Sequence, residues 1–274
     1  MKTSMTTLLY KHLGLMDYLA ALGLQEQLVA LKQREPSPDI LLFVEHSHVY
    51  TLGRGGKESN VLAPDDVPVY RTGRGGDVTY HGPGQLVVYP IIDLRSKLRK
   101  DVHRYVKNLE MSAIRTLADF GLEGTRRPPF TGIWIDPSTR APALGGGSCS
   151  GFRPTGVLEG ATGLPVGLHN RKIAAIGVAV RRCITYHGLA LNVNTDLSYF
   201  NRIVPCGLAW AEVTSMAKEL GAELDQREVR DRFLHHFAEV FDYGDLRESP
   251  IAEDGGWRVE DGHPRSSIIN PRYA

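Results

Sequence analysis

The segment KIAAIGVAV, residues 172–180, is the strongest indication of the fold, because apolar and small residues follow one another after Lys172 without interruption. Such a run is typical of a strand that is buried on both faces of a sheet. A lysine at the mouth of such a strand is usually solvated. If it points into a closed pocket instead, burial favours its neutral amine, which can accept a proton. The segment therefore predicts a central strand and one candidate general base.

Working outward from this strand, the pattern predicts a mixed set of elements. Further strands are expected at residues 40–44, 69–71, 86–92, 132–135 and 189–193, between turns that contain Gly or Pro. Apolar residues at helical spacing predict helices at residues 15–31, 101–120, 212–220 and 225–240. Gly121 stands where a left-handed C-cap would end the second helix. Strands and helices do not alternate strictly, so we expect an α/β (α+β) fold with a mixed β-sheet flanked by helices.

Composition excludes several classes of protein. The 274 residues carry 32 Lys and Arg against 31 Asp and Glu, a formal charge of +1, so a nucleic-acid-binding protein is not expected. No window approaches the roughly 18 apolar residues of a membrane span. Lys11 and His12 interrupt the apolar start of the chain, which argues against a secretory signal and predicts a cytoplasmic protein.

The three cysteines differ in their surroundings. An odd number without a C-x-x-C pair does not fit a disulfide framework or a zinc ribbon. Cys206 stands between Pro205 and Gly207 on a predicted loop, where a reactant could approach it. Cys183 follows two arginines at a strand break and fits a packing role, and Cys149 lies in a Gly-rich stretch.

A second conspicuous segment is RGGDVTYHGPGQ, residues 74–85, just ahead of a predicted strand. Glycines there allow the backbone to lie against a ligand and its amides to donate to an oxygen, although a tight structural loop is an open alternative. The spacing fits neither a P-loop nor a dinucleotide fingerprint.

Each of two histidine-containing segments has a structural explanation as well as a functional one. Glu45, His46 and His48 could bind a metal, but alternation along an extended segment puts Glu45 opposite both histidines, so no metal is expected. His187 with Gly188 is interpreted as a turn entering a strand, where a structural histidine is the favoured reading.

Two stretches look like additions to the core. We expect one domain at residues 1–244, a Gly/Pro-rich excursion at about 137–170 that is either a lid or a plain insertion, and a C-terminal extension at 245–274.

Taken together, the motifs resemble one family, the lipoate-biosynthetic octanoyltransferases, also called lipoyl(octanoyl) transferases. The matching segments occur in the family's order from about Leu8 to Phe241. They are Glu45-His46 with VYTLGR (49–54), RGGDVTYHGPGQ (74–85), GIW (132–134), KIAAIG (172–177), HGLALN (187–192) and PCG (205–207). The 137–169 stretch departs from the family, which usually has a short turn there.

This resemblance implies a fold similar to the catalytic domains of biotin and lipoate protein ligases, and an acyltransferase that needs no cofactor. It implies octanoyl transfer from octanoyl-acyl carrier protein to a lysine of lipoyl domains, in 2-oxoacid dehydrogenase E2 subunits and the glycine cleavage H protein. Cys206 is then the acyl-accepting nucleophile and Lys172 its activating base, with His187 in possible support. The implied octanoyl-binding residues are Arg74, Gly75, Gly76, Asp77, Val78, Thr79, Tyr80, His81, Ala175, Ile176, Gly177, Gly188, Leu189 and Ala190.

The chemistry expected of these residues is thioester exchange followed by amide formation. Lys172 would activate the thiol and later accept a proton from the incoming amine. Gly75, Gly76, Gly177 and Gly188 would leave space for the acyl chain, whose burial contributes up to roughly 5 kcal/mol. Arg126, Arg127, Arg153, Arg171, Arg181 and Arg182 could form a basic rim for acidic partners, or simply a solvated surface.

Two other functions remain open at this point. One is an ATP-dependent lipoate or biotin ligase on the same scaffold, which would need no cysteine. The other is a non-catalytic module that binds acyl groups or lipoyl domains.

Overall fold

The computed structural model describes residues 6–136, 158–159, 165–166 and 171–251, and its centre is a nine-stranded sheet. In spatial order the strands are β14 (Asp245–Glu248), β1 (Thr7–Met16), β2 (Asp39–His46), β6 (Gln85–Ile91), β12 (Ile184–Asn192), β11 (Arg171–Arg181), β8 (Phe130–Ile135) and β7 (Gly124–Arg127), with β13 (Glu212–Val213) beside β11. The β14–β1 and β1–β2 pairs are parallel, and β2, β6, β12, β11 and β8 pair antiparallel. The predicted mixed sheet is confirmed.

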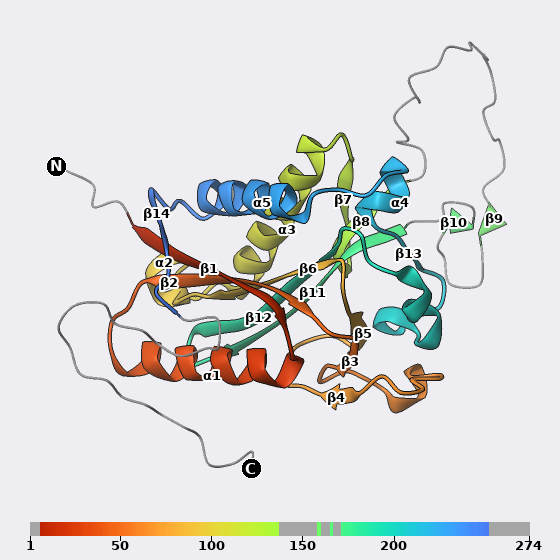
Figure 1. Ribbon diagram of the computed structural model, residues 1–274, viewed down its shortest axis with the longest axis horizontal. Coiled ribbons are helices and arrows are strands. Elements are labelled where there is room, and N and C mark those ends of the chain that lie inside the picture. Colours follow the sequence, from red (N-terminus) through yellow and green to blue (C-terminus); the bar gives the residue numbers. More distant parts are fainter. Residues whose placement is uncertain (1–5, 137–157, 160–164, 167–170, 252–274) are drawn as a thin grey trace, which may run out of the picture.

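Helices cover both faces of this sheet (Figure 1). Helix α1 (Tyr18–Arg34) packs on one face, where Ala21, Leu24 and Leu28 join a core with residues of β2 and β6. Helices α3 (Val102–Asp119) and α5 (Gln226–Val240) cover the other face, burying Leu109 and Phe233 among others. The sheet therefore separates two apolar cores, because its strands contribute alternate side chains to each.

The smaller elements lie beside this frame. Strands β4 (Val69–Arg71), β3 (Val49–Leu52) and β5 (Val78–His81) form a three-stranded sheet, and β9 (Leu158–Glu159) pairs with β10 (Pro165–Val166). The short helices are α2 (Leu94–Lys97), α4 (Met216–Leu220) and the 3₁₀ turns η1 (Glu58–Asn60), η3 (Leu197–Arg202) and η4 (Pro205–Gly207).

The expected helix at residues 15–31 was wrong at its start. Leu15 and Met16 end strand β1, and the helix begins only at Tyr18. The carboxylate of Asp17 accepts hydrogen bonds from the amides of Leu19 and Ala20 and so caps the helix. Leu15 happens to lie at helical spacing from the apolar residues of α1. The apolar residues of β1 follow too irregular a pattern for the strand to be recognised from the sequence.

The segment at residues 212–220 also differs from the prediction. Its first two residues pair with β11 as β13, and the helix starts after Ser215, whose hydroxyl accepts from the amide of Lys218. Residues 187 and 188, expected in a turn, lie within β12, and His187 has a positive φ of 55° there. Tertiary pairing with neighbouring strands overrode the local turn signal.

The C-terminal part of the described chain belongs to the main sheet. Asp245–Glu248, expected at the start of an extension, forms β14 and pairs with β1. Ile251 is buried in the core beneath α1. The Gly/Pro-rich excursion lies outside the described residues, apart from β9 and β10. None of the described helices is long and apolar enough to cross a membrane.

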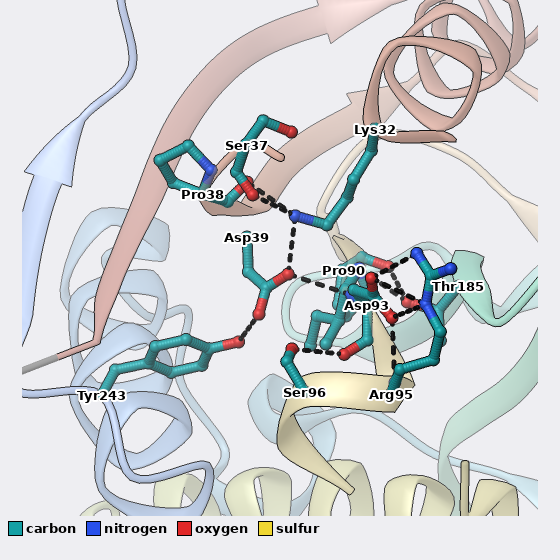
Figure 2. A network of polar contacts seen from close by, with 11 residues as sticks. Lys32, Ser37, Pro38, Asp39, Pro90, Asp93, Arg95, Ser96, Thr185 and Tyr243 are labelled. Carbon is teal, nitrogen blue, oxygen red and sulfur yellow. Dashed lines mark hydrogen bonds and ion pairs between the residues drawn. The ribbon is translucent and has the colours of Figure 1, made fainter. Parts of the chain in front are cut away.

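A buried network of polar contacts connects these elements at the N-terminal end of β2 (Figure 2). Lys32 at the end of α1 forms an ion pair of 2.9 Å with Asp39, and both side chains are buried. The other oxygen of Asp39 accepts from the hydroxyl of Tyr243 at 2.7 Å, and the amide of Asp93 donates to the first at 3.0 Å. One carboxylate thus connects α1, β2, the segment before α2 and the C-terminal segment.

Candidate active site

The structure brings the two proposed catalytic residues into contact. The Nζ atom of Lys172 lies 3.0 Å from the Sγ atom of Cys206, although the residues are 34 positions apart. Lys172 starts the apolar part of β11 and is 7% exposed. Its Nζ atom also lies over the ring of Trp134, 5.2 Å from the ring centre. A lysine in this position can share a proton with the thiol or stabilise the thiolate.

Cys206 is held in the short turn η4. The amide of Val204 donates to the carbonyl of Asn60 at 2.8 Å, and the amide of Gly207 donates back to the carbonyl of Val204 at 2.9 Å. Cys206 itself has a positive φ of 57°, which is uncommon for a residue with a side chain. Such strained backbone is found preferentially at functional sites.

A cavity of about 350 Å³ opens beside this pair, a size typical of small-molecule sites. It forms where the edge of β11 becomes free, because β8 pairs with β11 only as far as Ala174. Beyond that point the loop before β5 takes over, and the amide of Gly75 donates to the carbonyl of Val178 at 2.9 Å. The segment 74–81 and strand β11 therefore lie side by side and both line the cavity.

Of the residues that the resemblance implied, every one except Tyr80 lines this cavity. The direction of the Tyr80 side chain explains the exception. Thr79 and His81 face the cavity, whereas Tyr80 packs against Tyr50, Tyr199 and Phe200 in the core of the small sheet. We therefore do not keep Tyr80 among the candidate binding residues.

Arg74 supplies a buried positive charge to the cavity wall. Its guanidinium donates to the carbonyl and hydroxyl oxygens of Thr51 and to the carbonyl of Gly75. Burial lowers the pKa of Arg74, and the nearby Cys206 counteracts this shift. No acidic side chain among the described residues forms an ion pair with Arg74. Its charge is thus available to favour a thiolate or an oxyanion in the cavity.

The histidines of the site are buried in their neutral form. Burial lowers the pKa of His81 to about 3, of His187 to about 3 and of His46 to about 4. The Nδ1–H of His81 donates to Gln85 Oε1 at 2.8 Å, because the amide nitrogen of Gln85 donates elsewhere. The imidazoles of His81 and His187 add aromatic surface to the cavity without adding charge.

Two of the four glycines expected to leave space for the acyl chain, Gly177 and Gly188, serve a different purpose. A Cβ atom on Gly177 would lie 2.9 Å from both Arg74 Cδ and Gly75 O, and one on Gly188 would lie 2.1 Å from Val88 O. These two glycines permit close packing of protein against protein and do not leave empty space for an acyl chain.

Several cavity residues were not predicted from the sequence. They are Tyr18, Val87, Tyr89, Val106, Pro129, Phe130, Thr131, Val178 and Leu208. Alternation along the predicted strand at residues 86–92 already places Val87 and Tyr89 on one face, which was a usable signal. Tyr18 and Val106 come from helices far away in sequence, and only tertiary packing brings them here.

Glu45 and His46, two of the residues considered as metal ligands, are engaged in hydrogen bonds. Glu45 accepts hydrogen bonds from Gly84 N and Gln226 Nε2, and His46 is bonded to Met16 O and to the hydroxyl of Tyr89. Within the described ranges, one group could hold a metal ion, namely His235, His236 and Glu239 on α5. None of these three lines the cavity.

Three of the six arginines of the expected basic rim are paired with acidic side chains. Arg126 pairs with Glu110, Arg171 with Glu219 and Arg181 with Glu26. Arg127 stacks over the ring of Trp210 at 5.0 Å, and Arg153 lies outside the described residues. The pairing favours a structural role for Arg126, Arg171 and Arg181.

Comparison with known proteins agrees with this site. The chain matches the lipoyl protein ligase A/B catalytic domain over residues 17–238. An octanoyltransferase from Solibacter usitatus is 45% identical, with 88% of this chain and 96% of that protein covered. An octanoyltransferase from Flavobacterium psychrophilum is 39% identical, with 86% and 97% covered.

Solved structures support the fold in the same way. A bipartite lipoate protein ligase from Thermoplasma acidophilum superposes with a TM-score of 0.60 at 17% identity, covering 91% of this chain and 88% of that one. Lipoate-protein ligase A bound with ATP gives a TM-score of 0.60 at 17% identity, with 92% and 91% covered. The predicted likeness to lipoate ligase catalytic domains is confirmed.

The chain belongs to the lipoyl protein ligase A/B catalytic domain family, a class of mixed-sheet proteins that act in lipoylation. Within that family it groups with the octanoyltransferases, to which its sequence is similar over nearly their full length. It is accordingly an acyltransferase, and its activity is octanoyl transfer in protein lipoylation.

Proposed function

We propose that the enzyme takes an octanoyl group from octanoyl-acyl carrier protein onto Cys206 and passes it to a lysine of a lipoyl domain. The contact of 3.0 Å between Lys172 Nζ and Cys206 Sγ carries this proposal. It supports a thiol that is activated without a cofactor. The E2 subunits of 2-oxoacid dehydrogenases and the glycine cleavage H protein are the acceptors we propose.

In the first half of the reaction, the sulfur of Cys206 attacks the thioester of the donor. A new thioester forms on Cys206, the carrier thiol leaves, and the proton of Cys206 passes by way of Lys172 to the leaving thiol. One thioester replaces another, so the step needs no ATP. The charge of Arg74 supports stabilisation of the negative charge that develops.

In the second half, the acceptor amine attacks the octanoyl thioester. A C–N bond forms, the C–S bond breaks, and neutral Lys172 accepts a proton from the attacking nitrogen. The cavity walls hold the acyl chain meanwhile; the roles of the segment 74–81 (without Tyr80), of Ala175–Gly177 and of Gly188–Ala190 as the octanoyl site are part of this proposal, as is a supporting role for His187.

We also propose that the enzyme acts in the cytoplasm. The reaction requires a free thiol at Cys206, which a reducing compartment maintains. The other cysteine among the described residues, Cys183, lies in the turn between β11 and β12 and does not line the cavity.

The mass of the intact protein tests the proposal. After incubation with octanoyl-acyl carrier protein and no ATP, the wild-type enzyme is expected to gain one octanoyl group on Cys206. Cys206→Ser is expected to gain none and to lose octanoyl transfer to a lipoyl domain, because a serine hydroxyl is a far weaker nucleophile near neutral pH. Cys183→Ser serves as the matched control and should behave as the wild type.

Two results would contradict the covalent scheme. If Cys206→Ser keeps full transfer, no thioester on this residue is needed. If transfer occurs only when ATP is added, the chain activates a free acid, as a ligase does.

A further inference from the structure

The wall formed by residues 74–81 contains one acidic side chain, whose charge the acyl-transfer scheme has so far not used. Asp77 is the single carboxylate among the described residues that line the cavity. No lysine or arginine side chain in the described part of the chain forms an ion pair with it. The nearby Arg74 is directed to Thr51 and to the carbonyl of Gly75 instead.

Hydrogen bonds hold this carboxylate in a fixed orientation. Oδ1 accepts from the amide of Val78 at 2.6 Å and of Lys57 at 3.3 Å, and Oδ2 accepts from the side-chain amide of Asn60 at 2.6 Å. An ionised carboxylate offers about four acceptor sites. One site therefore remains, and it belongs to Oδ2.

The Oδ2 atom lies against the turn that carries the nucleophile. A Cβ atom on Gly207 would stand 2.7 Å from it, and Gly207 has a positive φ of 69°. Only glycine fits here for both reasons, because a side chain would strain the backbone and collide with the carboxylate. Oδ2 of Asp77 thus lies next to the residue that follows Cys206 in the turn, and Asp77 and Cys206 line the same cavity.

Charge balance indicates what this site is for. The acceptor lysine approaches as an ammonium ion, because an ordinary lysine is protonated near neutral pH. Arg74 already brings a positive charge to the cavity wall, and this charge opposes a second cation. A carboxylate next to the thioester offsets this repulsion.

We propose that Asp77 binds the ammonium group of the acceptor lysine beside the acylated Cys206. This inference rests on the proposed function and assigns a residue to its second half. The ammonium group docks on Oδ2 and gives one proton to solvent, and the amine then attacks the thioester carbon. The C–N bond forms, the C–S bond breaks and the second proton passes by way of Lys172 to the departing sulfur of Cys206, so the products are an octanoyl-lysine amide and the free thiol.

The test separates three rates for the wild type, Asp77→Asn and Asp77→Gln. They are octanoyl-enzyme formation from octanoyl-acyl carrier protein, its discharge to a lipoyl domain, and its discharge to hydroxylamine, which is uncharged at neutral pH. Loss of a charge-assisted hydrogen bond should slow discharge to the lipoyl domain roughly tenfold. Formation and discharge to hydroxylamine should slow far less than discharge to the lipoyl domain, because neither involves a cationic amine.

Glu58→Gln is the matched control. Its carboxylate is exposed, pairs with Arg71 and does not line the cavity, so all three rates should stay unchanged.

Each other outcome overturns the inference. Unchanged discharge to the lipoyl domain means that Asp77 does not bind the amine. An equal loss with hydroxylamine, or loss of octanoyl-enzyme formation in both variants, means that Asp77 only positions the Cys206 turn. Failure of the wild type itself to form an octanoyl thioester contradicts the proposed function instead.

Discussion

The side chain of Lys172 runs from the buried start of β11 to the sulfur of Cys206, and this position determines the chemistry that its amine can perform. Its stem is buried at the start of β11, while its amine reaches Cys206 Sγ. A Cβ atom on Gly132 would lie 2.7 Å from Lys172 Cε, so the glycine in the neighbouring strand makes room for this side chain. A positive charge stabilises a thiolate, and a neutral amine can accept a proton; lysine can provide both, whereas arginine provides only the first.

Substitutions of Lys172 are expected to separate these two roles. Lys172→Arg keeps the charge and should still form the octanoyl-enzyme, but its transfer to the lipoyl domain should fall by roughly 10²–10⁴, the usual contribution of a general base. Lys172→Met should lose both steps. Single-turnover rates of the two half-reactions measure this, and Lys218→Met, at an exposed position on α4, is the control. Full turnover in both Lys172 variants would exclude this residue as the base.

At the scale of elements, α1 and β2 are fastened to the C-terminal segment by buried polar groups. Lys32 also donates to the carbonyls of Ser37 and Pro38, so its ammonium group has a full set of acceptors (Figure 2). Lys97 lies 3.9 Å above the ring of Tyr243 and donates to the carbonyl of Asp242. Buried charges of this kind are costly to leave unpaired, since the protein interior solvates them poorly.

The network should therefore respond strongly to loss of its carboxylate. We expect Asp39→Asn to lower the free energy of unfolding by about 3 kcal/mol, because it leaves the Lys32 cation buried without a counter-charge. Tyr243→Phe, which removes one hydrogen bond, should cost only about 1 kcal/mol.

Urea denaturation measures both changes. Lys11→Met breaks a pair with the largely exposed Glu248 and should change stability by less than about 1 kcal/mol. An Asp39→Asn protein as stable as the wild type would show that the ion pair contributes little.

For the molecule as a whole, the two ends of the described chain close the sheet together. Strand β14 pairs with β1, the amide of Ser249 donates to the carbonyl of Tyr10 at 2.7 Å, and Ile251 is buried under α1. None of the residues that form this edge of the sheet lines the cavity. Stability and catalysis should therefore be separable here.

Two truncations test this separation. A chain ending at Ile251 should be as stable as the full chain. A chain ending at Gly244 should lose roughly 3 kcal/mol, because it loses the burial of Ile251 and the hydrogen bonds of β14. Thermal unfolding compares them, and octanoyl transfer well below the melting temperature should be equal in both. Equal stability of the two chains would show that β14 is dispensable.

Much of the architecture was readable from local patterns. The strands at residues 69–71 and 173–180, the helix at 101–120 and its left-handed cap at Gly121 were predicted correctly. The helix has apolar residues at helical spacing, and the segment 173–180 is an uninterrupted run of apolar and small residues. The motifs around Lys172 and Cys206 also identified the family. By contrast, β1, β3, β5 and β7 carry no regular pattern, since neighbouring strands rather than their own sequence hold them in place.

The sequence by itself determined which side chains this protein has for chemistry, and it indicated a mixed sheet with helices on both sides. Only the tertiary structure decided which of them meet. Lys172 touches Cys206, Asp77 lies against Gly207, and Tyr80 turns away from the cavity, because strand pairing and the alternation of side chains set these distances. Contacts between residues far apart in the chain depend on how the elements pack, and no local pattern encodes that.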